Sequence, residues 1–126
     1  MHKLRQAWLV LGCLWVVTII FLTLTPHPPE PMHFENADKL EHALAYAGLM
    51  LWFCQIYLKL AQRLLLAVLL TGMGIALEYV QRMTGYRYFE YADMLADGAG
   101  VLLGWALANT LPGRFYALLE TKLNNR

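Results

Sequence analysis

Polar and ionisable side chains recur at helical spacing inside three apolar stretches of this sequence. Asp38, His42 and Tyr46 are four residues apart, so a helix over this stretch places them on one face. Glu78 and Gln81 are three residues apart and share a face of a second helix. Carboxylates are costly inside an apolar segment, so they are expected to be paired, hydrated, metal-bound or functional.

Two further acids, Asp93 and Asp97, stand one turn apart at the start of the third stretch. They accompany a stripe of small residues: Ala92, Ala96, Gly100, Gly104 and Ala108. This spacing lets membrane helices pack backbone to backbone. We therefore expect both acids to face the interior of a helical bundle.

These groups have chemical and purely structural interpretations, and the sequence leaves both open. Carboxylates suit Mg²⁺ or Mn²⁺, and a histidine among them can act as a ligand or a general base. In structural terms, Asp38 can cap its helix while Lys39 extends to the head groups. Glu78 can pair with Arg82, four residues away, and His42 can bond between helices. No cofactor is identified, and no metal site is predicted.

The composition indicates a membrane protein. Of the 126 residues, 59% are hydrophobic, and the mean hydropathy is +0.42, which is unusually apolar for a soluble domain of this size. The net charge of +1 gives no basic field that would attract nucleic acid. Cys13 and Cys54 lie in apolar runs and are expected to behave as small buried residues.

Four apolar segments predict four helices, at about residues 7–24, 38–58, 63–82 and 92–111. Prolines between residues 26 and 31 interrupt the chain after the first, and Pro112-Gly113 ends the fourth. Apolar residues alternate with charged ones over residues 115–123, which predicts a short amphipathic segment on the membrane surface. The prediction is an all-α protein with a single domain at 1–126. It is an integral membrane bundle of four transmembrane helices with a short amphipathic C-terminal surface segment.

The basic residues predict the orientation of the bundle. One side receives Lys3, Arg5, Lys59, Arg63, Arg114, Lys122 and Arg126, and the other receives Lys39, Arg82 and Arg87. Because cytoplasmic loops carry the excess of basic residues, both termini are expected in the cytoplasm. Every acid except Glu120 then falls in the outer half. The basic start also resembles a signal peptide, but no small-residue cleavage site follows, so the first helix is expected to be retained.

The ordered set Asp38-Lys39-x-x-His42-x-x-x-Tyr46, Glu78-x-x-Gln81, Arg87 and Asp93-x-x-x-Asp97-x-x-Gly100-x-x-x-Gly104 resembles the VanZ-like family of small integral membrane proteins. The resemblance covers the second to fourth helices. Asp97 stands where members commonly carry asparagine, and the glycine near the arginine comes one place earlier, as Gly85-Tyr86-Arg87. The resemblance implies a multi-pass protein of the bacterial cytoplasmic (inner) membrane. The family is named for low-level resistance to the lipid-tailed glycopeptide teicoplanin, and the resemblance supplies no activity.

One functional hypothesis is a protein that binds a lipid-linked cell-envelope molecule, or a lipid-tailed glycopeptide, at its outer face. The planar guanidinium of Arg87 suits a phosphate or carboxylate. The candidate binding residues are Asp38, Lys39, His42, Tyr46, Glu78, Gln81, Arg87, Asp93 and Asp97. An aromatic belt at the membrane interface is expected at Tyr79, Tyr86, Tyr88, Phe89 and Tyr91.

The alternative is an intramembrane enzyme acting on a lipid phosphate or pyrophosphate head group. His42, Glu78, Asp93 and Asp97 would then hold a divalent cation or perform acid–base chemistry. Ion transport is less favoured, because the ionisable residues occupy one half of the bundle only. Membrane lipid is the expected partner under both hypotheses, and nucleic acid is not.

Overall fold

The computed structural model describes residues 2–24, 37–84, 91–110 and 114–124, and over these residues it contains helices and no strand. The helices are α1 (His2–Leu24), α2 (Ala37–Cys54), α3 (Leu60–Thr84), α4 (Tyr91–Ala108) and α5 (Phe115–Asn124). The predicted all-α class is confirmed.

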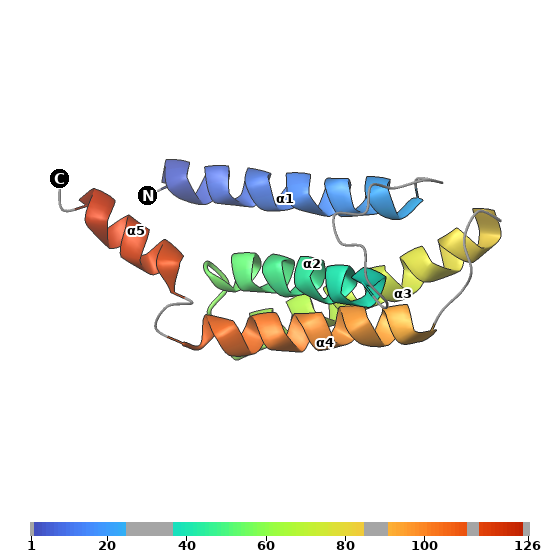
Figure 1. Ribbon diagram of the computed structural model, residues 1–126. Coiled ribbons are helices and arrows are strands. Elements are labelled where there is room, and N and C mark those ends of the chain that lie inside the picture. The colour runs from blue at the N-terminus through green and yellow to red at the C-terminus, as the bar shows by residue number, and fades with distance from the viewer. Residues whose placement is uncertain (1, 25–36, 85–90, 111–113, 125–126) are drawn as a thin grey trace.

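Helices α1 to α4 lie side by side and alternate in direction, so α2 and α4 run parallel to each other (Figure 1). The starts of α2 and α4 and the ends of α1 and α3 form the acidic end, defined by Glu78, Asp93 and Asp97. The opposite, basic end is defined by Arg63 and Arg114. Helix α5 lies there, so the chain begins and finishes at the same end of the bundle (Figure 1).

Helices α2 and α4 make the closest contact in the bundle, and two glycines permit it. A Cβ atom on Gly100 would collide with the backbone carbonyl of Ala43, and one on Gly104 with that of Ala47. The two backbones therefore touch over two successive turns, as the small-residue spacing predicts. Leu49, Met50 and Val101 fill the core beside this contact and are almost fully buried.

Helix α1 packs on α2 through tryptophan. The indole rings of Trp8 and Trp52 are stacked with centroids 3.7 Å apart, and each ring N–H donates to the other residue's carbonyl over 2.8 Å. Further along, the ring of Trp15 lies against Gly48, where a Cβ atom would be 2.5 Å from the indole. Bulky rings on one helix thus fit against the other, and a glycine makes room for one of them.

The observed helix limits differ from the predicted ones. α2 ends at Cys54 instead of residue 58, because the buried guanidinium of Arg63 bonds the carbonyls of Cys54 and Tyr57 and turns the chain there. α4 ends at Ala108 instead of residue 111. α1 and α3 begin earlier than predicted, at His2 and Leu60, because their polar first turns are also helical.

Two of the described helices are long and apolar enough to cross a membrane. They are α1 over Lys3–Leu24 and α3 over Leu60–Met83, with mean hydropathies of 2.5 and 1.8. α2 and α4 have 18 residues each, which at about 1.5 Å per residue is roughly 27 Å. Their first turns carry charged side chains, so length and composition alone do not mark them as spans.

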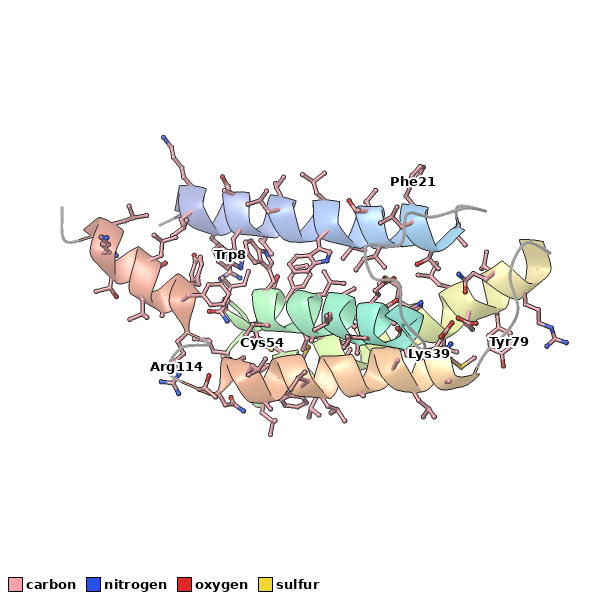
Figure 2. The ribbon with its side chains drawn as sticks, viewed as in Figure 1. Trp8, Phe21, Lys39, Cys54, Tyr79 and Arg114 are labelled. Carbon is pink, nitrogen blue, oxygen red and sulfur yellow. The ribbon has the colours of Figure 1, made fainter. Side chains whose placement is uncertain are left out.

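Apolar side chains nevertheless cover the outward faces of all four helices. Examples are Val10, Val17 and Phe21 on α1, Leu44 on α2, Leu65, Val68 and Leu69 on α3, and Leu95 and Leu102 on α4. The exposed fraction reaches 67% at Phe21, whose ring points away from the bundle in Figure 2. Soluble monomers rarely expose so many large apolar side chains together, so these faces support association with a membrane.

Candidate binding site at the acidic end

Two ion pairs join α2 to α4 at the acidic end. The Lys39 Nζ atom lies 2.9 Å from Asp93 Oδ1, and the His42 Nδ1 atom lies 2.8 Å from Asp97 Oδ1. Lys39, labelled in Figure 2, lies between the first turns of the two helices. Because α2 and α4 are parallel, the pairs follow each other down the interface and lead into the close contact at Gly100.

The acids in these pairs are more deeply buried than the cations. Asp93 and Asp97 side chains are 8% and 3% exposed, whereas those of Lys39 and His42 are 23% and 18% exposed. Asp93 Oδ1 makes no well-directed hydrogen bond despite the ammonium 2.9 Å away, so its pairing with Lys39 is chiefly electrostatic. The site therefore holds its carboxylates inside and presents the Lys39 ammonium and the His42 ring, a cation when protonated, toward the outside.

Helix α3 closes the site with a glycine and a third acid. A Cβ atom on Gly74 would lie 2.5 Å from Asp97 Oδ2, so the missing side chain leaves room for the carboxylate. One turn further on, Glu78 is 2% exposed. Its carboxylate acts electrostatically on both His42 and Tyr46, and Asp93 and Asp97 also act on the histidine. The imidazole thus contacts Asp97 directly and lies within electrostatic range of Asp93 and Glu78.

Some of the other residues predicted for the site or the aromatic belt pack or form hydrogen bonds within the bundle. Tyr46 is 2% exposed and belongs to the hydrophobic core. Gln81 Nε2 donates to the Thr23 carbonyl over 2.8 Å, at the end of α1, where helix carbonyls lack partners within the helix. The exposed ring of Tyr79 lies at the acidic end, as the predicted aromatic belt requires (Figure 2).

Part of the predicted set lies outside the described residues. This applies to Arg87, Tyr86, Tyr88 and Phe89, and to the side chains of Asp38 and Tyr91. The structure therefore brings together Lys39, His42, Tyr46, Glu78, Asp93 and Asp97, which we call the polar cluster. The two cysteines differ, since Cys54 is buried as expected but Cys13 is exposed on α1.

The polar cluster offers two kinds of chemistry. Lys39 and His42 supply cationic donors for an anion, and a histidine held by a carboxylate is the arrangement of a general base. Within the described part of the chain, no three His, Cys, Asp or Glu side chains come together as a group able to hold a metal ion. A cavity of about 460 Å³ lies at the basic end, away from this cluster.

Sequence reasoning missed the polar and aromatic groups of the basic end. Arg63 is 9% exposed and donates to the carbonyls of Cys54 and Tyr57 and to Asn109 Oδ1, over 2.7–3.0 Å. It thereby joins the end of α2, the start of α3 and the end of α4. The sequence signal for this role is a single arginine beside an apolar run, a pattern that by itself indicates only membrane topology.

An aromatic cluster, also missed, fixes α5. Phe115 and Tyr116 pack on Trp8, with ring centroids 5.6 and 4.9 Å away. The Tyr116 N–H donates to Gln55 Oε1 over 3.1 Å. Burial raises the pKa of the Tyr116 hydroxyl, and the nearby Glu120 carboxylate raises it further. The hydroxyl is therefore neutral where Tyr116 packs on Trp8.

Comparisons of the chain with protein families, with curated proteins and with solved structures found no match.

Proposed function

We propose that this chain is a four-span protein of the bacterial cytoplasmic (inner) membrane, related to the VanZ-like family, with both termini in the cytoplasm. The exposed apolar surface on all four helices supports the four spans. The basic side chains Arg63 and Arg114 at one end of the bundle support the orientation. The family proposal rests on the ordered sequence motifs from Asp38 to Gly104.

The ion pairs make α2 and α4 acceptable as spans. Each is roughly 27 Å long against a hydrocarbon core of about 30 Å, so its charged first turn lies near the head groups. Lys39 and His42 oppose the charge of Asp93 and Asp97 there, which lowers the cost of placing the carboxylates at that depth.

At its outer, acidic end the protein binds the head group of a lipid-linked cell-envelope molecule, or a lipid-tailed glycopeptide of the teicoplanin type. One observation carries this proposal: the acids are buried while their partner cations Lys39 and His42 are partly exposed. The acids hold the cations in place, and the exposed donors face an incoming phosphate, pyrophosphate or carboxylate. The apolar sides of α1 and α4 flank the lipid tail.

A second candidate is an intramembrane enzyme that hydrolyses a lipid phosphate or pyrophosphate. It is favoured by the 2.8 Å approach of Asp97 to His42, which fixes the ring as in a histidine that activates water. If the protein is a phosphatase, Asp97→Asn should abolish hydrolysis of the lipid phosphate. If it is a binding protein, the same substitution should lower its affinity for the lipid only in part.

Co-purification tests the binding proposal. The wild-type protein and a Lys39→Met/His42→Gln variant would be purified in nanodiscs, and bound lipids identified by mass spectrometry. We expect the variant to retain about thirtyfold less phosphate-bearing lipid, since each of the two cations near a head group contributes about 1 kcal/mol.

Lys122→Gln is the control, because it removes one exposed cation from α5, away from the polar cluster. Equal lipid retention by wild type and a folded double variant would refute the binding proposal. Phosphate release from an added prenyl pyrophosphate, abolished by Asp97→Asn, would instead establish the enzyme.

A further inference from the structure

A cavity with a partly polar lining lies at the basic end, and its lining residues are not part of the polar cluster at the acidic end. Its volume is about 460 Å³, within the ~300–1,000 Å³ range of ligand sites. Its lining consists of Cys54, Gln55, Leu58, Arg63, Ala108, Asn109, Arg114 and Ala117. Cys54 and Arg114, both labelled in Figure 2, lie at this end of the bundle.

Both charged residues of the lining are arginines. Arg63 is held rigidly, because its guanidinium donates to two backbone carbonyls and to the side chain of Asn109. All three acceptors are neutral, and within the described residues no carboxylate lies at ion-pair distance from Arg63 or Arg114. A buried cation without a counter-charge favours the binding of an anion.

The remaining lining residues help to select the ligand. Gln55 is fixed at both ends of its amide, since Nε2 donates to the Leu51 carbonyl and Oε1 accepts from the Tyr116 N–H. Leu58, Ala108 and Ala117 supply apolar contacts beside the two arginines. The lining thus combines a fixed guanidinium, an exposed one and an apolar wall.

We propose that this cavity binds a phosphate-bearing group, through Arg63 and Arg114, independently of the polar cluster at the acidic end. Arginine suits phosphate because its planar guanidinium offers two parallel donors to two oxygens. Arg63 fixes the position of the anion, and Arg114, on the exposed side, closes over it. The phosphate belongs either to an anionic phospholipid or to a soluble compound, and the same chemistry serves both.

Arg114→Gln tests the site with little risk to the fold, because the Arg114 side chain is exposed and forms no ion pair with a described residue. Lys122→Gln is the control, as it removes one exposed cation from α5 away from the cavity lining. Binding of phosphatidylglycerol to the purified full chain would be measured by native mass spectrometry, with diacylglycerol as the lipid that lacks a phosphate. Inorganic phosphate would be titrated in parallel.

We expect Arg114→Gln to weaken phosphatidylglycerol binding about fivefold, and Lys122→Gln to leave it within about twofold. Competition by inorganic phosphate at millimolar concentration would identify a soluble ligand, and its absence together with phosphatidylglycerol selectivity would identify the lipid. Equal effects of the two variants, or no preference for phosphatidylglycerol and no phosphate binding, would overturn the proposal. The fivefold effect of Arg114→Gln should persist in a Lys39→Met background, which separates this site from the function proposed for the acidic end.

Discussion

The Nδ1 atom of His42 lies 2.8 Å from Oδ1 of Asp97, across the interface of two parallel helices. Gly74 on α3 makes room for the same carboxylate, whose other oxygen would meet any Cβ placed there. The buried carboxylate of Asp97 on α4 therefore contacts both α2 and α3. Its removal should affect both the stability of the bundle and the position of the imidazole.

Asp97→Asn should be tolerated better than Asp97→Leu. The asparagine has nearly the same shape and keeps an acceptor for His42, so we expect a loss of about 1 kcal/mol. Leucine removes the acceptor and adds bulk against Gly74, for which we expect a loss of about 3 kcal/mol. Thermal unfolding in detergent would measure both, and a larger loss for asparagine than for leucine would contradict the pairing.

The Lys39–Asp93 pair should show rescue by charge exchange. Lys39→Glu places a second acid beside Asp93, and the melting temperature should fall. Adding Asp93→Lys restores opposite charges, and about 0.5–1 kcal/mol should be recovered, since Lys39 is partly exposed and screened. Additive losses in the double variant would mean that the two side chains do not interact.

Gly100→Ala should destabilise the bundle far more than Gly72→Ala. The new methyl at position 100 meets the Ala43 carbonyl and forces α2 away from α4, at a cost of about 1–3 kcal/mol. At Gly72 nothing lies within 4 Å of the added Cβ atom, so the change should be neutral or stabilising by up to about 1 kcal/mol. Equal melting temperatures for the two variants would argue against the close α2–α4 contact.

The proposed topology can be tested by cysteine labelling in a chain with Cys13→Ala and Cys54→Ala. Met83 is 84% exposed at the acidic end, and Met83→Cys should react with an impermeant maleimide in intact spheroplasts. Asn124→Cys, at the end of α5, should react only after the membrane is opened. Labelling of both positions in intact cells would contradict a cytoplasmic C-terminus.

Much of the fold follows from local patterns in the sequence. Apolar runs predict the four long helices, and the small residues Gly100 and Gly104 predict the face of α4 that packs closely. His42 and the acids are expected at similar depths along their helices, and this predicts that they are neighbours in the bundle. The alternating directions follow from the short connection between α2 and α3.

The pairing of side chains was less predictable, because it depends on how each helix is rotated about its axis. The ion pair of Lys39 with Asp93 on another helix is not indicated by either local sequence. The hydrogen bond from Gln81 to the Thr23 carbonyl likewise joins residues 58 apart in sequence. The stacking of Trp8 on Trp52 joins residues 44 apart in sequence, and nothing local indicates it.

The most direct test of the central proposal is the affinity of the purified protein for a prenyl phosphate, measured by native mass spectrometry beside the matching prenyl alcohol. The account predicts a clear preference for the phosphate in the wild type. It also predicts an affinity about thirtyfold weaker in Lys39→Met/His42→Gln and unchanged in Lys122→Gln, which removes a cation outside both proposed sites. Equal binding of phosphate and alcohol, or a folded double variant that binds the phosphate like the wild type, would contradict a head-group site at the acidic end.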